Sequence, residues 1–335
     1  MPKKKLAVYT ATGCSSCGNT ILDIHYDLGS LTRNAEIVFW PYLLGSRWDE
    51  LNDQTDIDVC FFAGAIRTKT DRIAAARLRS NSKLLVACGA CAAFGGLPGL
   101  SDLCPDPPAP ANSAQEEVPE DEALLPELES RIFALEHIVD VDYFVPGCPP
   151  SRDFLWAAIQ SLVLIGESPT NISFASSRLP LTLANAITAG VLPRHGSVFA
   201  GEKAVCASCS RIKEEKKFNA FYRPYQVNPD SGRCLLEQGI LCQGLATREG
   251  CGGLCTSVGV GCRGCYGKAE AVFDHGAKMV SAVSSTFDST DSSELARLAD
   301  SFVDLAGTFY RYTLATQCAL MTPNPEEIGH ASNNS

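Results

Sequence analysis

The sequence predicts an α/β protein whose first half is a doubly wound parallel sheet, followed by a cysteine-rich segment and C-terminal helices. In the first half of the 335-residue chain, apolar β-rich runs alternate with stretches of helix-compatible composition. Such alternation is typical of parallel sheets with helices on both faces. Eight of the 16 cysteines lie between residues 206 and 265, where apolar periodicity is too weak for a separate core.

Five strands and the helices between them define the first domain, expected at about residues 1–165. The strands are expected at residues 6–10, 36–42, 57–63, 83–87 and 141–145. Segments 19–31 and 70–79 have the composition of the connecting helices. Later in the chain, a short helix is expected over 181–189 and a longer amphipathic one over 292–315, the better of two helices expected in 269–320.

Changes in composition give the remaining boundaries. Residues 105–126 are rich in proline and acids, which resist strand pairing and burial, so they are expected to form a surface insertion. Residues 166–200 form a linker rich in Gly, Ser and Pro. Residues 201–268 are the cysteine-rich domain, and 269–335 hold the C-terminal helices and a tail.

The charge argues against a nucleic-acid partner, and the hydropathy argues against a membrane span. The net charge is −10, and no basic stripe supplies a footprint for nucleic acid. No apolar run reaches the roughly 18 residues of a membrane span. The N-terminus passes directly into a strand without a cleavable apolar core, so a cytoplasmic location is expected.

The number of cysteines points to metal ligation. In a reducing compartment, thiols in such number favour metal binding over disulfides. Three isolated cysteines are expected to be small buried side chains instead. These three are Cys60, Cys104 and Cys318.

Four thiols are expected to meet at the carboxyl edge of the sheet, where open α/β folds form their sites. Cys14 and Cys17 follow the first strand, Cys91 follows the fourth and Cys148 follows the fifth. Four thiolates are what a [4Fe–4S] cluster requires. Cys88 forms a second Cys-x-x-Cys with Cys91, but strand alternation leaves Cys88 at the strand end, which favours Cys91 as the ligand.

Two other uses of the first Cys-x-x-Cys remain open. A zinc site would use the same four thiols. A thioredoxin-type redox pair would use Cys14 and Cys17 alone. The redox pair is the weaker alternative, because Ser15 and Ser16 lack the usual aromatic and proline context.

The eight later cysteines divide into two sets of four. Sequence order assigns them to one cluster with Cys206, Cys209, Cys234 and Cys242, and another with Cys251, Cys255, Cys262 and Cys265. A zinc ribbon would use four and leave four unexplained, whereas two cubanes leave none. Bacterial ferredoxins exchange a ligand between clusters, so this partition is the simpler of two. The fold expected is a flavodoxin-like doubly wound sheet followed by a small iron–sulfur domain with little regular structure.

Several segments resemble one family. TGCSSCGNTILDIH, ACGACAAFGGLPG and VPGCPPSRD resemble the small subunit of [NiFe]-hydrogenases. RCLLEQGILCQGLATREGCGGLC and GVGCRGCYG extend this resemblance to the cytosolic group 3 branch, the methyl-viologen-reducing, non-deazaflavin-reducing type. The resemblance covers the first domain and residues 201–268, about two thirds of the chain. It implies an electron-transfer subunit without catalytic residues of its own.

The resemblance also implies a role for each set of cysteines, with all three clusters [4Fe–4S]. The set Cys14, Cys17, Cys91 and Cys148 would hold the proximal cluster. The set beginning at Cys206 would hold the distal cluster, and the set containing Cys255 the medial one. Cys206 stands where periplasmic relatives have histidine, and Cys255 where many have proline and a three-iron cluster. The glutamate that many relatives carry close to the first motif is absent, since Gly18 and Asn19 follow Cys17.

The resemblance implies two partners. One is a large subunit with the nickel–iron site; the other is a flavin- or iron–sulfur-containing acceptor, such as a heterodisulfide-reductase-type module. The alternative is an electron-transfer subunit of a related complex, nickel-free or complex-I-like. Complex I relatives typically have adjacent cysteines at the first motif and lack the eight-cysteine segment. The five histidines are scattered and are expected at the surface or in the core: His25, His137, His195, His275 and His330.

Overall fold

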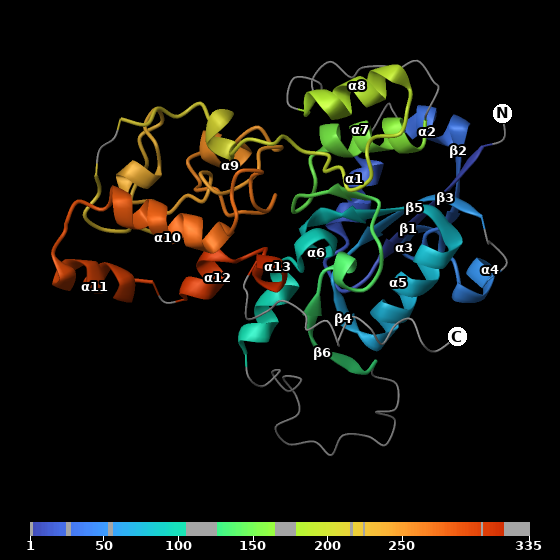
Figure 1. Cartoon of the computed structure of the whole chain (residues 1–335), viewed down its shortest axis with the longest axis horizontal. Helices are drawn as coiled ribbons and strands as arrows, with labels where there is room; N and C mark the ends of the chain where they lie inside the picture. Colours follow the sequence, from blue (N-terminus) through green and yellow to red (C-terminus); the bar gives the residue numbers. More distant parts are fainter. Residues whose placement is uncertain are drawn as a thin grey trace.

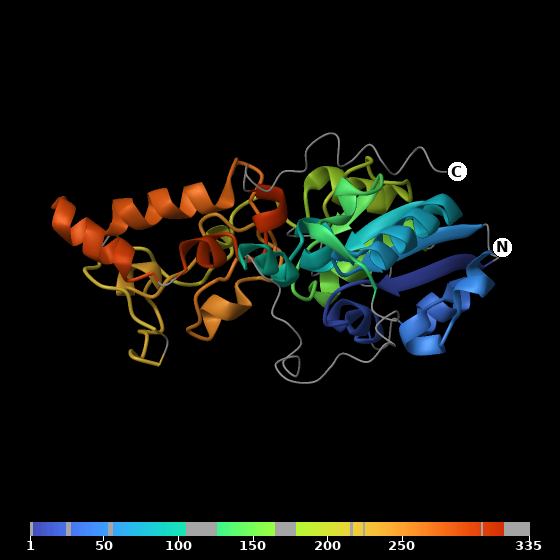
Figure 2. The same ribbon diagram turned by 90° about the horizontal axis from the view of Figure 1, so that it is seen from below.

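The computed structural model describes most of the chain, in eight segments. They are residues 3–24, 28–52, 56–104, 126–164, 179–214, 217–223, 225–302 and 304–317, without the side chains at 50 and 52. The α/β part and the cysteine-rich part with the C-terminal helices lie side by side along the long axis of the molecule (Figures 1 and 2).

A five-stranded sheet with every neighbouring pair parallel organises the first part (Figure 1). Its strands, in spatial order, are β2 (Ala35–Phe39), β1 (Lys4–Thr10), β3 (Ile57–Ala63), β5 (Ser82–Cys88) and β7 (Tyr143–Val145). This is the order of the flavodoxin-like doubly wound fold, so the predicted fold class is confirmed.

Helices cover both faces of this sheet (Figure 1). On one face, Leu6 and Val8 of β1 belong to a core that includes residues of α1 (Ser16–Leu22), α7 (Arg152–Leu162) and α8 (Leu181–Ala189). On the other face, Ala7 belongs to a core with residues of α5 (Lys69–Asn81) and α6 (Gly89–Phe94). Successive side chains of a strand point to opposite faces, so β1 contributes to both cores.

Several expected boundaries in the first part are wrong. The helix expected over 19–31 is described as α1 and α2 (Leu28–Asn34), with residues 25–27 outside the described part. The strand expected over 36–42 ends at Phe39, because Pro41 begins the short helix α3 (Pro41–Leu44). Proline is suited to the first turn of a helix, where its missing N–H is not needed. The last strand, expected from residue 141, begins only at Tyr143.

A small second sheet was not predicted. β4 (Ile66–Thr68) pairs antiparallel with β6 (Leu128–Phe133). Of the expected insertion 105–126, only residue 126 is described. The other short elements are α4 (Trp48–Asn52), η2 (Leu97–Leu103) and η4 (Leu135–His137).

The cysteine-rich part has little regular structure, as predicted. Its elements are single turns: η5 (Val205–Ala207), η6 (Leu236–Gln238) and α9 (Leu254–Ser257). It is followed by α10 (His275–Thr286), α11 (Ser292–Asp300), α12 (Leu305–Phe309) and α13 (Leu314–Gln317). Both segments contribute to one apolar core, which contains Phe218 as well as Phe287 and Phe309.

The single helix expected over 292–315 is wrong, because the chain forms α11, α12 and α13 instead. Asp304 caps the start of α12, where its Oδ1 accepts a hydrogen bond from the Gly307 N–H at 2.7 Å. Aspartate at this position stabilises a new helix start. The helix expected over 181–189 is confirmed as α8.

Among the described residues, none of the helices combines the length and the apolar character needed to cross a bilayer.

Candidate functional site

Four cysteines line one small cavity at the carboxyl edge of the large sheet. Cys14 lies just before α1 and Cys17 within it, Cys91 lies in α6 after β5, and Cys148 follows β7. These elements are far apart in the sequence, and the parallel sheet brings their ends to one edge. The structure therefore brings together the four thiols that the sequence singled out.

Two glycines make room for these thiols. A Cβ added at Gly89 would lie 2.2 Å from the Sγ of Cys17, and one added at Gly96 would lie 2.6 Å from the Sγ of Cys91. Both glycines have positive φ, +87° and +58°, a conformation that favours glycine. The backbone therefore approaches the thiols more closely than any other residue type would allow.

Burial and mutual proximity make the thiolate forms unfavourable in this cavity. Burial first, and then the neighbouring thiols, raise the pKa of Cys17, and the same causes raise the pKa of Cys91 to about 12. Cys14 differs, because hydrogen bonding with Ser16 lowers its pKa. Buried thiols bind as thiolates only where positive charge compensates, and the iron of a cluster would supply that charge.

Cys88 does not line this cavity. It is completely buried at the end of β5, and burial raises its pKa to about 12. Cys60 is buried as expected, whereas Cys104 is exposed. The expectation for Cys104 is wrong because this residue follows the last turn of η2 at the surface. Cys318 lies outside the described residues.

Two cysteines of the first later set lie close to the same glycine. A Cβ at Gly244 would lie 3.4 Å from the Sγ of Cys206 and 3.6 Å from that of Cys242. Burial, followed by the neighbouring Cys242, Cys234 and Cys209, raises the pKa of Cys206 to about 12. These are the four cysteines that sequence order groups together.

The second set is adjacent to both of the others. Burial raises the pKa of Cys265 to about 12, with further contributions from Cys251, Cys148 and Cys255. Cys262 is buried beside Cys265 and also beside Cys242 of the first later set, and both neighbours add to the effect of burial in raising its pKa.

Backbone hydrogen bonds connect the three sets in a line. The N–H of Cys148 donates to the thiol of Cys265, which links the sheet-edge set to the set containing Cys265. The N–H of Cys262 donates to the Sγ of Cys242 at 3.3 Å, which links that set to the one containing Cys206. The set containing Cys265 therefore lies in the middle.

Two side chains that sequence reasoning missed also contact the thiols. The hydroxyl of Tyr312 hydrogen-bonds with Cys148, and the thiol of Cys209 donates to the Oγ1 of Thr256 at 3.2 Å. Tyr312 lies in a segment that contains no motif cysteine, where the backbone Gly96 N–H donates to its carbonyl at 3.2 Å. No sequence signal marks it, because only the fold brings it to the site.

Among the described residues, no three Cys, His, Asp or Glu side chains converge closely enough to chelate a single metal ion. The four thiolates of a cubane each bind a different iron, so they need to surround a group rather than meet at a point.

The surroundings of the described histidines are those of core or surface residues, as expected. His275 is buried and hydrogen-bonds with the carbonyl of Phe309 at 3.0 Å and with Thr247 at 3.1 Å. Burial lowers the pKa of His137 to about 4. His195 is exposed, with its Nε2 3.3 Å from a carboxylate oxygen of Asp142. His25 and His330 lie outside the described residues.

Comparison with known proteins identifies relatives over nearly the whole chain. Residues 14–162 match the family described as NADH ubiquinone oxidoreductase, 20 Kd subunit. A vhu-type F420-non-reducing hydrogenase subunit of Methanococcus voltae is 32% identical, and the match covers 93% of this chain and 96% of the relative. The protein of the same name from Methanocaldococcus jannaschii is 35% identical over 82% of this chain and 85% of its own length.

A third relative carries the cofactor in its name. The F420-non-reducing hydrogenase iron-sulfur subunit of Archaeoglobus profundus is 30% identical over 92% of this chain and 96% of its own length. Because identity at this level extends over more than four fifths of the chain in each case, the chain belongs to this family of F420-non-reducing hydrogenase subunits and is a non-catalytic small subunit of a hydrogenase.

Proposed function

We propose that this chain relays electrons between the nickel–iron site of a [NiFe]-hydrogenase large subunit and an acceptor module, through three [4Fe–4S] clusters. The observation that carries the proposal is the linear arrangement of the three sets of four thiols. Hydrogen bonds between neighbouring sets keep them adjacent, which a relay requires. The group 3, methyl-viologen-reducing type follows from the sequence resemblance, as does a cytoplasmic location.

Each set would hold one cluster. The proximal ligands are Cys14, Cys17, Cys91 and Cys148; the medial ligands are Cys251, Cys255, Cys262 and Cys265; the distal ligands are Cys206, Cys209, Cys234 and Cys242. When bound, such clusters supply one-electron redox chemistry whose potential depends on hydrogen bonds to sulfur and on burial. The chain's own residues provide both, through the N–H groups of Cys148 and Cys262 and through nearly complete burial of Cys242 and Cys262.

The large subunit would dock at the cavity of the proximal set. The surrounding segments are 13–19, 95–100 and 147–151, and they include the exposed Cys14 and Leu97, the latter 44% exposed. Apolar groups exposed beside a buried redox site fit an interface with another subunit. The acceptor, flavin- or iron–sulfur-containing and for instance of the heterodisulfide-reductase type, would dock near the distal set.

The proposal divides the chain into a cluster-bearing α/β domain (1–165, with the insertion 105–126), a linker (166–200), a two-cluster domain (201–268) and C-terminal helices with a tail (269–335). The last two share one apolar core. They are therefore expected to unfold together.

Metal analysis of the anaerobically purified protein tests the proposal. Three cubanes require about 12 irons per chain, with equal acid-labile sulfide, since each cubane holds four of each. An EPR-monitored redox titration should resolve signals from reduced [4Fe–4S] clusters only. Stoichiometric zinc with about four irons would contradict the two later clusters.

A complex-I-like electron-transfer subunit is the second candidate. The matched family is named for an NADH ubiquinone oxidoreductase subunit, but the match ends at residue 162, before the eight later cysteines. Nickel analysis of the native complex separates the candidates. A co-purifying large subunit without nickel would favour the second.

A further inference from the structure

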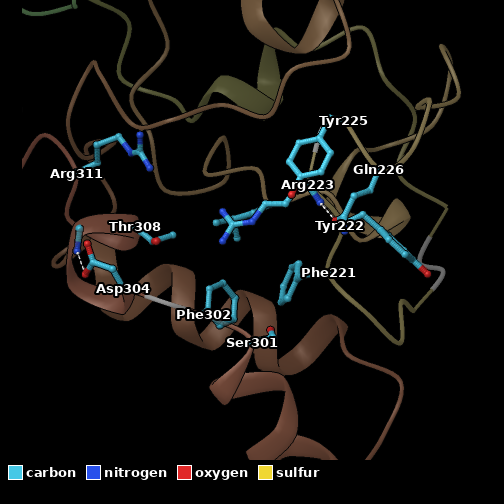
Figure 3. Close-up of a pocket in the computed structure, with 12 residues that line it drawn as sticks. Phe221, Tyr222, Arg223, Tyr225, Gln226, Ser301, Phe302, Asp304, Thr308 and Arg311 are labelled. Atoms are coloured by element: carbon cyan, nitrogen blue, oxygen red, sulfur yellow. Dashed lines mark hydrogen bonds between the residues drawn. The ribbon is translucent and has the colours of Figure 1, made fainter.

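A cavity of about 450 Å³ lies between residues 221–223 and 225–226 on one side and the C-terminal helices on the other, and none of its described lining residues is a cysteine (Figure 3). Its volume falls within the roughly 300–1,000 Å³ of small-molecule sites. Leu241, the residue before Cys242, forms part of the wall. The Nε2 of Gln243 donates to the carbonyl of Thr308 in the opposite wall at 2.7 Å, which fixes the cavity beside the proposed distal set.

Two arginines point into this space from opposite sides. Figure 3 shows the guanidinium groups of Arg223 and Arg311 extending toward one another across the cavity. Within the described residues, neither guanidinium forms an ion pair with a carboxylate. The Nε of Arg311 is buried without a hydrogen-bond partner. Because neither guanidinium is paired with a carboxylate among the described residues, both are available to an anion that enters the cavity.

One carboxylate also faces the cavity, but it already has a partner. The Oδ1 of Asp304 accepts the N–H of Gly307 at 2.7 Å as the cap of α12 (Figure 3). Two guanidinium groups against this one carboxylate give the cavity lining a local excess of positive charge, although the whole chain carries −10.

Aromatic rings form the remaining wall. The rings of Phe221 and Phe302 are 4.8 Å apart at 62°, and Phe302 packs in turn on Phe309 at 5.3 Å. Phe221 is also held against Phe218 at 4.6 Å. Tyr225 stands at the rim and is 85% exposed. Phe218 and Phe309, which hold the two lining phenylalanine rings from behind, belong to the buried core, so the aromatic wall is preformed and offers ring faces and edges to a planar ligand.

We propose that this cavity binds a small organic phosphate, with the phosphate between Arg223 and Arg311 and a flat ring against the aromatic wall. Guanidinium groups bind phosphate oxygens in pairs of parallel hydrogen bonds, which a single ammonium group does not. Inorganic phosphate alone would leave most of the volume and the aromatic wall unused. The ligand class therefore includes adenine nucleotides and flavin mononucleotide, which share a phosphate and a planar ring.

Equilibrium binding to the anaerobically purified holo complex tests this inference. The probes are flavin mononucleotide, AMP and inorganic phosphate, each titrated calorimetrically. We expect one of the two organic phosphates to bind saturably, at least about tenfold more tightly than inorganic phosphate, which corresponds to about 1.4 kcal/mol. Which of the two binds identifies the source as a flavin or an adenine nucleotide.

Matched variants assign the binding to this cavity. Arg223→Gln and Arg311→Gln should each weaken binding by about tenfold or more. Arg297→Gln is the control, because this exposed arginine of α11 does not line the cavity. Unchanged iron content verifies that each variant is folded. If the Arg311→Gln variant loses iron, the Arg223→Gln variant alone tests the assignment, because Arg223 is exposed.

Absence of saturable binding by both organic phosphates would overturn the inference, as would equal affinity of the wild type and a folded Arg223→Gln variant. An acidic segment of a partner protein that occupies the cavity would produce the absence of saturable binding by both organic phosphates. These measurements do not depend on electron transfer, so their failure would leave the proposed relay untouched.

Discussion

Replacing Gly89 by alanine should prevent the protein from holding the proximal cluster. Gly89 has φ +87°, where an L-residue costs about 1–2 kcal/mol relative to glycine. The added Cβ would lie 2.2 Å from the Sγ of Cys17, whereas ordinary contact begins at 3.4 Å, so the sulfur must move by about 1.2 Å (3.4 − 2.2). A side chain forced off its rotamer costs about 0.5–1.5 kcal/mol more. The moved thiol would no longer face the position that the other three surround.

Gly196→Ala is the matched control. Gly196 has φ +80°, and a Cβ there would meet nothing within 4 Å. Both variants therefore place an alanine at a similar positive φ, but only Gly89→Ala displaces a thiol. The assay is iron and acid-labile sulfide per chain after anaerobic reconstitution. We expect Gly89→Ala to lack about four irons, one cubane's content, and Gly196→Ala to keep all of them. Equal iron in the two variants would refute the assignment of Cys17 as a ligand held in place by Gly89.

Three other measurements address Tyr312, the cysteine-rich part and the proposed docking face. Tyr312→Phe removes a hydrogen bond to Cys148, which stabilises the more negative reduced cluster, so an EPR redox titration should give a lower proximal potential. Tyr310→Phe is the control: the Tyr310 hydroxyl donates to Asp274 at 2.7 Å, so its loss should leave the proximal potential unchanged. Equal proximal potentials in the two variants would count against the contact between Tyr312 and Cys148. Anaerobic chelation of iron should make residues 201–268 protease-sensitive before the α/β domain, because metal-organised segments unfold without metal. An unchanged digestion pattern after complete iron loss would show that this segment does not depend on its clusters for folding. The chain expressed alone with reconstituted clusters should aggregate on size exclusion, since the proposed docking face is exposed, and a monodisperse monomer at high concentration would argue against that face.

The sheet could be predicted from the sequence because local apolar patterns mark its strands. Ile57–Ala63 is apolar except for Asp58, as is typical of a buried parallel strand, and β3 has these bounds. Sequence order offers a division of the eight later cysteines because the members of each set follow one another in the chain, and this division stays a prediction. The contacts of Cys206 with Cys242 and of Cys265 with Cys251 follow that division, although the ligand roles stay a prediction.

Other features depend on contacts that periodicity does not report. Leu295, Leu298 and Phe302 continue in helical spacing to Phe309, so the apolar pattern runs through the break that Asp304 makes by capping α12. The pairing of β4 with β6 joins strands separated by about 60 residues, and β4, with three residues, carries almost no alternation of its own. Such non-local pairings become visible only in the folded chain.

The C-terminal helices connect the two parts of the proposed relay. α10, α11 and α12 complete the core of the cysteine-rich part, which contains Met279, Leu298 and Phe309. The chain then returns to the sheet edge, where α13 lies beside α6 (Figure 1), and a Cβ at Gly95 would meet the Cβ of Ala315 at 2.7 Å. Because one continuous segment packs against both the helix that carries Cys91 and the core around Cys242 and Cys262, it fixes the spacing between the proximal set and the others. A segment without a motif cysteine would therefore contribute to the proposed relay by holding the sets of thiols at their spacing.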